Sequence, residues 1–121
     1  MPHEELYLHD IIEATNVIEK FLLNANRDQF FDSELLQSAV LHKLTIIGEA
    51  CSKLPKDLRD KHSGIDWKQI IGFRNIAIHA YFSVDLGIVW ETSTTRLKSL
   101  REQIAQILQN DFPNFEYKPK T

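Results

Sequence analysis

The sequence predicts an all-α fold, an up-and-down antiparallel helical bundle of four long helices plus one short helix. Apolar residues recur at the 3.6-residue helical period in four segments, and no segment alternates between apolar and polar residues as a strand does. The 4 Gly and 4 Pro are few for a loop-rich β protein. Short connections between amphipathic helices favour antiparallel neighbours. With 43% hydrophobic residues the chain can bury one core, so we expect a single helical domain at residues 1–110 and an irregular tail at 111–121.

The first two long helices are expected in the N-terminal half of the chain. An amphipathic pattern over residues 4–23 predicts the first, and the polar run NANRDQ is expected to end it. Asp32 is the predicted N-cap of the second, which should run to about Lys53. Gly48 lies inside this second helix, where glycine costs roughly 1 kcal/mol relative to alanine. We therefore expect another helix to approach closely at Gly48.

The short helix and the third long helix follow. Pro55 suits the first turn of a short helix that should end near Lys61. Asp66 is the predicted N-cap of the third long helix, with Gln69 three residues later as in a capping box. This helix should begin at Trp67 and continue through the segment FRNIAIHAY.

The fourth long helix is expected to begin after an N-cap at Asp85. Its apolar stripe contains Leu86, Trp90, Leu97, Leu100, Ile104 and Leu108. Pro113 lies beyond its predicted end.

Composition argues against several classes of protein. No apolar run approaches the ~20 residues of a membrane span, and the N-terminus lacks the pattern of a signal peptide. The lone cysteine, Cys51, leaves no internal disulfide, so together with the missing signal-peptide pattern we expect a cytoplasmic protein. Cys51 itself is expected in the core. His3, His9, His42 and His62 are scattered and expected at the surface, and no Gly-rich phosphate loop exists. We therefore expect neither a metal nor a cofactor.

Charge is unevenly distributed along the chain, whose net charge is −3. Residues 1–52 hold 3 Lys/Arg against 9 Asp/Glu, which is −6; residues 53–74 hold 6 against 3, which is +3; residues 75–121 hold 5 of each. The acidic total is unlike that of a protein that coats nucleic acid. The basic excess at 53–74 is either a solvated loop or the rim of an anion-binding site.

The segment FRNIAIHAY, residues 73–81, places Arg74, Asn75, His79 and Tyr81 in an otherwise apolar stretch. Burying such groups unpaired would cost roughly 2–7 kcal/mol each, so they must be paired, reach solvent or do chemistry. Arginine donors match phosphate oxygens and histidine exchanges protons near neutrality, so the set fits cleavage of RNA at a 2′-hydroxyl without a metal. A structural explanation stays open, with His79 as a charge at a helix C-terminus and Arg74 paired with an acid of the first helix.

Longer motifs carry a family resemblance that covers most of the chain. They are YLHDIIEA at 7–14, IIGEA at 46–50, WKQIIGFRNIAIHAYF at 67–82 and VW at 89–90. With these motifs the sequence resembles the HepT-like branch of the HEPN superfamily. The resemblance implies a helical bundle that forms a homodimer, and a metal-independent endoribonuclease that is the toxin of a type VII-like toxin–antitoxin pair. The implied partners are RNA as substrate and an MNT-type nucleotidyltransferase as antitoxin.

The same resemblance assigns roles to residues that match the R-x4-H-x-Y motif. Arg74 and His79 correspond to the catalytic pair, and Asn75 to the polar position after the arginine. Tyr81 corresponds to the tyrosine that the partner nucleotidyltransferase of some members modifies with AMP, which silences the ribonuclease. Ala80 stands where the family often has glycine, a departure that bears on how the helix ends and how Tyr81 is presented.

Alternatives remain for one residue and for the chain as a whole. Glu49 lines the predicted dimer cleft, pairs with Arg74 or is a surface carboxylate. The chain is either the ribonuclease, a non-catalytic helical partner that presents a nucleotide or substrate to a minimal nucleotidyltransferase, or a plain dimeric scaffold. Nucleotide affinity without RNA cleavage would favour the second of these.

Overall fold

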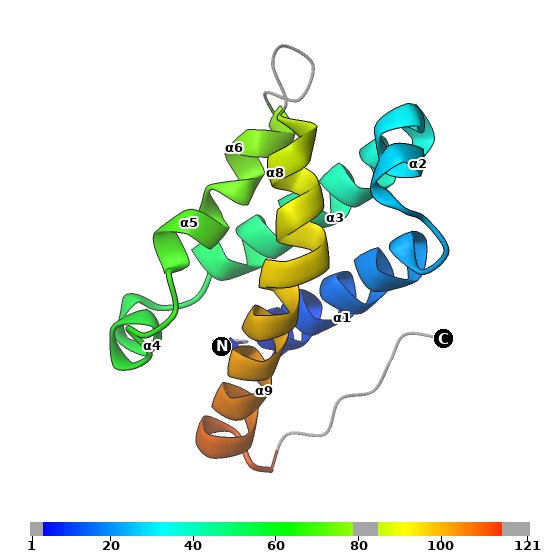
Figure 1. Ribbon diagram of the computed structural model, residues 1–121. Helices are drawn as coiled ribbons and strands as arrows, with labels where there is room; N and C mark the ends of the chain where they lie inside the picture. Colours follow the sequence, from blue (N-terminus) through cyan, green and yellow to red (C-terminus); the bar gives the residue numbers. More distant parts are fainter. Residues whose placement is uncertain (1–3, 79–84, 115–121) are drawn as a thin grey trace.

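The computed structural model describes residues 4–78 and 85–114, and every element in these two ranges is helical (Figure 1). In chain order the elements are α1 (Glu4–Leu22), α2 (Arg27–Asp32), α3 (Glu34–Ser52), α4 (Lys56–Lys61), α5 (Trp67–Ile71), α6 (Phe73–Ile78), α8 (Leu86–Glu91), the π-helical turn η1 (Thr92–Arg96) and α9 (Leu97–Asp111). The all-α prediction is confirmed. None of the helices described is long and apolar enough to cross a membrane.

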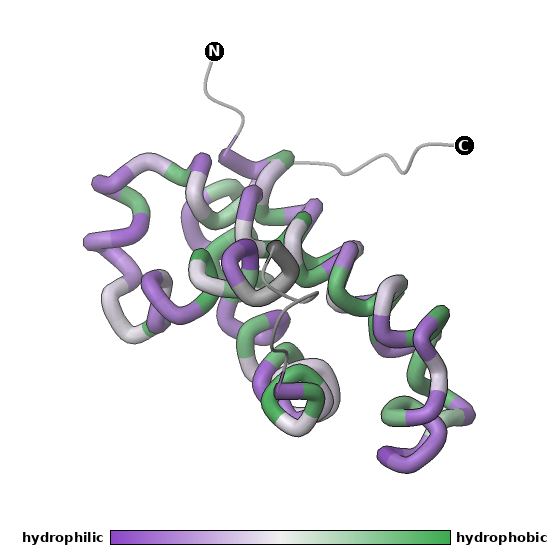
Figure 2. The backbone as a smooth tube through the Cα atoms, turned by 90° about the horizontal axis from the view of Figure 1, so that it is seen from above, coloured by the Kyte–Doolittle hydropathy of each residue, from purple (hydrophilic) through white to green (hydrophobic). Residues whose placement is uncertain are grey.

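Helix α3 lies at the centre of the fold and contacts α1, α2, α5 and α6. It packs on α1, and α2 also contacts it. Helices α5 and α6 lie along another side of α3, while α8, η1 and α9 form one continuous rod that runs across α1 (Figure 1). Figure 2 shows hydrophobic and hydrophilic residues recurring along the helices at about the spacing of a turn, as amphipathic helices require. The homodimer stays a prediction.

The core lies where α1, α3 and α9 meet. Its fully buried side chains include Leu8, Ile11, Ile18, Leu44, Ile47, Leu97 and Ile104. Each such side chain contributes roughly 1.5–3 kcal/mol by leaving water. Cys51 is buried among them as expected, and burial raises the pKa of its thiol to about 12.

The first helix ends before the run NANRDQ, as expected, but the predicted N-cap at Asp32 was wrong. The same run also starts a short helix that was not predicted from the sequence, because Asn26 and Gln29 form the capping box of α2. The Asn26 Oδ1 accepts from the Gln29 backbone N at 2.8 Å, and Gln29 Oε1 accepts from the Asn26 backbone N at 2.8 Å. Asp32 is the last residue of α2 rather than an N-cap; Ser33 caps α3, its Oγ accepting from the Leu36 backbone N at 3.0 Å.

The third predicted helix begins where expected but is divided. Asp66 caps it, its Oδ1 accepting from the Gln69 backbone N at 3.1 Å, and Trp67 is the first helical residue. Helix α5 then ends at Gly72, and α6 starts at Phe73. A Cβ at Gly72 would lie 3.1 Å from the Gln69 carbonyl oxygen, so the bend leaves little room for a larger residue.

The last helix also begins where expected. Asp85 caps α8, its Oδ1 accepting from the Gly87 backbone N at 2.9 Å. The π-helical turn η1 interrupts the regular pattern, and the Thr94 hydroxyl donates to the Trp90 carbonyl oxygen at 2.7 Å. Helix α9 ends at Asp111, and Pro113 follows its end.

Polar contacts join the C-terminal end of α9 to the C-terminal end of α4. Lys61 Nζ lies 3.1 Å from one carboxylate oxygen of Asp111, and His62 Nε2 lies 2.8 Å from the other. The hydrogen bond from His62 is the main reason that the pKa of Asp111 is lowered, with Lys61 adding to it and burial opposing it. His62, expected at the surface, is therefore partly buried and in hydrogen-bond contact with Asp111.

Candidate functional site

Helix α6 carries the first part of the predicted motif. Arg74 and Asn75 occupy its second and third positions, and the Asn75 side chain is exposed. The Asn75 backbone N donates to the Gly72 carbonyl oxygen at 2.9 Å, which continues the backbone hydrogen bonding across the bend. His79 and Tyr81 lie outside the described residues, so their predicted roles are neither supported nor contradicted by the geometry.

Gly48 of α3 lets α6 approach at Arg74. A Cβ at position 48 would lie 2.9 Å from the Arg74 backbone N, 3.2 Å from the Arg74 Cβ and 3.2 Å from the Ile71 carbonyl oxygen. Such distances are shorter than the ~3.5–4.0 Å of favourable carbon contacts. The expectation of a close helix contact at Gly48 is confirmed, and this contact fixes where the Arg74 Cα lies.

The Arg74 guanidinium is held by the residue next to that glycine. Arg74 Nη1 donates to Glu49 Oε1 at 2.9 Å, with 38% of the Arg74 side chain and 44% of the Glu49 side chain exposed. Arg74 therefore pairs with an acid of α3, not with an acid of the first helix. An ion pair this exposed contributes about 0–1 kcal/mol to stability, so it orients the guanidinium without locking it. A phosphate could displace or share this contact.

Sequence reasoning missed Gly72, which ends α5 and so sets the direction of α6. The available signal was a glycine inside an apolar, helix-periodic stretch, where a packing or geometric reason is usual. Within residues 4–78 and 85–114, no three His, Cys, Asp or Glu side chains gather as a metal ion would require.

The fold and site define a small helical protein that presents an arginine, paired with a carboxylate, in the first turn of a short helix. A family model described as ribonuclease HepT-like matches residues 11–107, which is most of the chain. The chain belongs to the HepT-like ribonuclease family.

Individual relatives agree with this membership. The chain is 39% identical over 105 residues to a Methanocaldococcus jannaschii protein named as a gamma-glutamylcyclotransferase and candidate RNase, a match that covers 87% of this chain and 47% of that protein. It is 36% identical over 105 residues to a candidate RNase of Caldanaerobacter subterraneus subsp. tengcongensis, covering 87% and 94%. It is 36% identical over 101 residues to the probable ribonuclease HepT of Thermococcus cleftensis, covering 84% and 92%. The chain thus spans about half the length of the first relative and most of the other two. No solved structure is a significant match.

Proposed function

We propose that this chain is a metal-independent endoribonuclease whose site is built around Arg74. Membership of the HepT-like ribonuclease family supports this function. The observation that carries it is the position of the Arg74 guanidinium, partly exposed and oriented by Glu49 at 2.9 Å. A guanidinium stays charged at any working pH and offers paired donors that match phosphate oxygens.

The proposed reaction is an internal transesterification of RNA. A 2′-hydroxyl loses its proton and its oxygen attacks the adjacent phosphorus, while the bond from phosphorus to the 5′-oxygen breaks and that oxygen gains a proton. The products are a 2′,3′-cyclic phosphate on the upstream fragment and a 5′-hydroxyl on the downstream fragment. His79 moves the proton, Arg74 stabilises the negative charge that develops on the phosphate, and Asn75 orients the imidazole or the phosphate.

A homodimer completes the proposed site. Arg74 and His79 are five residues apart, so on an ideal helix they would point about 140° away from each other. A cleft shared by two subunits removes this difficulty, because the arginine of one copy can act with the histidine of the other. Paired histidines would also supply both the base and the acid that the reaction needs.

The proposed biological role is that of a toxin controlled by a partner enzyme. An MNT-type nucleotidyltransferase, the antitoxin, would attach AMP to Tyr81. A nucleotide attached two residues from His79 would place bulk and negative charge beside the phosphate site and so block RNA. In the alternative role, the chain binds a nucleotide or substrate for such a partner and does not cleave RNA.

Purified protein, incubated with RNA in the presence of EDTA, tests the function. We expect cleavage with 2′,3′-cyclic phosphate ends, and its loss in His79→Ala and Arg74→Ala with the helical content unchanged. Lys98→Gln, which removes an exposed charge on α9, is the matched control and should cleave normally. Cleavage equal in His79→Ala and wild type would contradict the proposal, and nucleotide binding without cleavage would support the alternative role. The intact mass after co-expression with a candidate nucleotidyltransferase tests the modification of Tyr81.

A further inference from the structure

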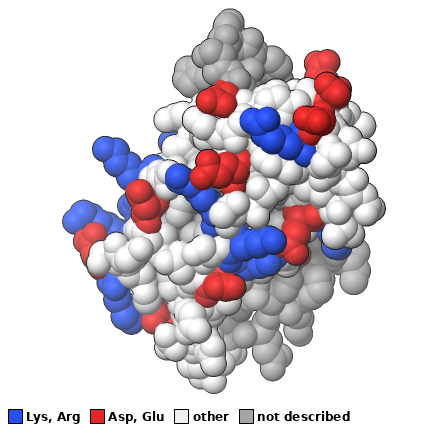
Figure 3. Space-filling model, in the orientation of Figure 1, with Lys and Arg blue, Asp and Glu red and all other residues white. Residues whose placement is uncertain are grey.

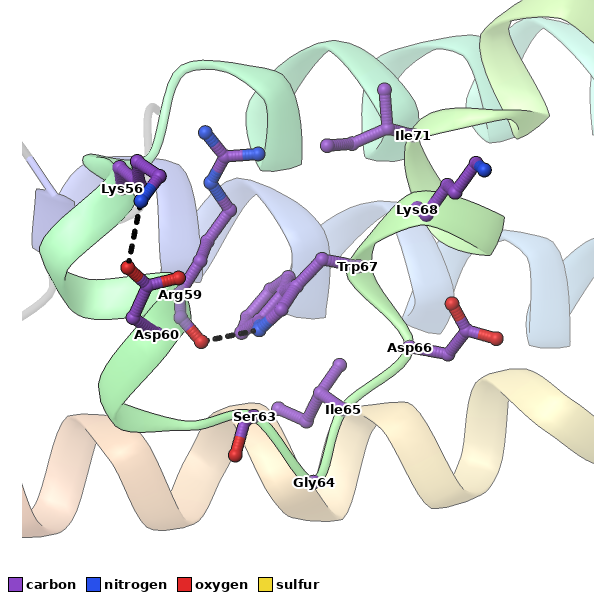
Figure 4. Close-up of a pocket in the computed structure, with 10 residues that line it drawn as sticks. All are labelled: Lys56, Arg59, Asp60, Ser63, Gly64, Ile65, Asp66, Trp67, Lys68 and Ile71. Atoms are coloured by element: carbon purple, nitrogen blue, oxygen red, sulfur yellow. Dashed lines mark hydrogen bonds and ion pairs between the residues drawn. The ribbon is translucent and has the colours of Figure 1, made fainter.

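Half of the basic residues in the positively charged segment 53–74 line one groove. Of its six cations, Lys53 lies over the Tyr7 ring, Lys61 pairs with Asp111 and Arg74 pairs with Glu49. The other three are Lys56, Arg59 and Lys68, and all three line a groove of about 690 Å³ between α4 and α5 (Figure 4). Figure 3 shows several Lys and Arg side chains, with Asp or Glu side chains among them, on the side of the molecule where Figure 1 places these two helices.

The two acids of the groove are already engaged. Asp60 pairs with Lys56 at 3.2 Å, and Asp66 accepts the backbone N–H that caps α5. Arg59 and Lys68 carry no such partner in the described part of the chain, where no carboxylate lies within ion-pair distance of either. The groove therefore presents two uncompensated cations.

Arg59 is the more telling of the two cations. Its Nε is buried and has no hydrogen-bond acceptor among the described residues, although a buried donor of this kind is normally satisfied. Figure 4 shows its guanidinium extending from α4 past Trp67, away from the Asp60 carboxylate and into the groove. Because Arg59 lines the groove and pairs with no carboxylate among the described residues, its guanidinium is suited to an anion that enters the groove from solution.

We propose that this groove binds a phosphodiester of the RNA strand at a distance from the bond that is cut. This inference rests on the proposed function and adds a second contact point for the same substrate. The groove adjoins α6 because Ile71, which lines it, supplies the carbonyl oxygen that packs on Gly48 beside Arg74. A strand held at Arg59 and Lys68 could therefore continue towards Arg74.

The groove is suited to the backbone of the strand rather than to a base. Its one aromatic side chain, Trp67, is only 8% exposed, and its indole Nε1 donates to the Arg59 and His62 carbonyl oxygens at 3.1 Å each. A base would need an open ring face for stacking, and Trp67 offers none. Contacts of this kind carry no sequence preference.

Binding of an RNA analogue, measured by fluorescence anisotropy at several salt concentrations, tests the inference. The probe is a fully 2′-O-methylated oligoribonucleotide, which cannot be cleaved because its 2′-oxygens carry no proton. Each phosphate contact with a single strand contributes about 0.7 to the slope of log K against log salt. Lys68→Gln should therefore weaken binding about five-fold at 0.1 M salt and lower the slope by about 0.7. Arg59→Gln should act in the same direction, and Lys68 carries the test if the half-buried Arg59 proves necessary for folding.

Matched controls separate a local contact from an overall charge effect. Lys98→Gln removes one positive charge, as Lys68→Gln does, but on α9 and outside the groove. Glu102→Gln on α9 likewise removes one negative charge, and both control variants should leave affinity almost unchanged. Asp60→Asn releases Lys56 and should tighten binding, whereas Glu102→Gln should not. Equal effects of Lys68→Gln and Lys98→Gln would overturn the inference, as would AMP competing as strongly as the oligonucleotide. A chain that fails to cleave RNA but shows the Lys68-specific loss would refute the nuclease and leave the groove assigned to RNA.

Discussion

Gly48→Ala is the most direct perturbation of the site that leaves its charged groups untouched. The new methyl group would lie 2.9 Å from the Arg74 backbone N, and this atom cannot turn aside as the tip of a side chain could. Restoring an ordinary contact of roughly 3.5 Å requires α6 to move away from α3 by on the order of 0.5 Å. Overpacking of this kind costs typically 1–3 kcal/mol, and alanine returns about 1 kcal/mol through its higher helix propensity.

We therefore expect Gly48→Ala to lower the free energy of unfolding by about 0–2 kcal/mol, measured by urea denaturation. We expect activity to fall as well, because the substitution displaces Arg74. Because a 1 Å displacement of a catalytic group can cost roughly 100-fold, a shift half that size should reduce kcat/KM for RNA about ten-fold.

Gly64→Ala is the matched control. A Cβ at position 64 meets nothing within 4 Å, and no glycine among the residues described has a positive φ. This variant should stay within about 0.5 kcal/mol of the wild type and keep its activity. If Gly48→Ala were as stable as Gly64→Ala and cleaved RNA at the wild-type rate, the argument that this contact positions Arg74 would be refuted.

Three further predictions concern single groups. Glu49→Gln keeps the shape of the residue but removes its charge. We therefore expect the Arg74 guanidinium to bind RNA more tightly but to be less well oriented. Steady-state kinetics should show a lower KM and a kcat reduced by about two- to five-fold, consistent with an exposed ion pair of 0–1 kcal/mol. Because the pKa of Asp111 is lowered in the folded protein, the unfolded chain binds more protons than the folded chain in acid. The Asp111 carboxylate therefore stabilises the fold at pH values above its unfolded pKa, near 3.8. This contribution is lost as the pH falls through the pKa of Asp111 in the folded protein. Asp111→Asn should flatten the fall in stability below about pH 4 in urea titrations, and a curve as steep as that of the wild type would show that the contacts of Asp111 with His62 and Lys61 are not responsible. The Cys51 thiol, buried and with a pKa of about 12, should resist a thiol reagent at pH 8 in the folded protein and react promptly in denaturant; rapid labelling of the native state would indicate that α3 opens readily.

Local signals in the sequence located most of the helices. Asp66 and Asp85 were recognised as N-caps because each precedes a clear apolar pattern, and a cap depends only on the next three residues. The boundary between α2 and α3 was misjudged because Asp32 and Ser33 are adjacent and both are good capping residues. Only the backbone geometry at Ser33 and the capping box at Asn26 distinguish them.

The site could be predicted only in part, since the sequence orders its residues but does not place them. The residue types of Arg74, Asn75 and His79 were sufficient to propose contact with a phosphate, and the family resemblance added the catalytic roles. Pairing of Glu49 with Arg74 was one of three alternatives that the sequence left open, and it is confirmed by the contact that α3 makes with α6 near Gly48. In the sequence, the groove at Arg59 was visible only as a local excess of positive charge. The sequence could not show which cations line the groove, because three of the six make contacts outside it.

The π-helical turn from Thr92 to Arg96 has a consequence for the evolution of the chain. A turn of this kind holds one residue more than a regular α-helical turn, which is what a single inserted codon would leave behind. Because each residue advances a helix by about 100°, removing one would rotate α9 relative to α8 by that angle unless the turn reverted to a regular helix. Relatives that lack the extra residue should therefore show a one-residue gap between Thr92 and Arg96 and a regular helix there, with the faces of α8 and α9 on either side preserved.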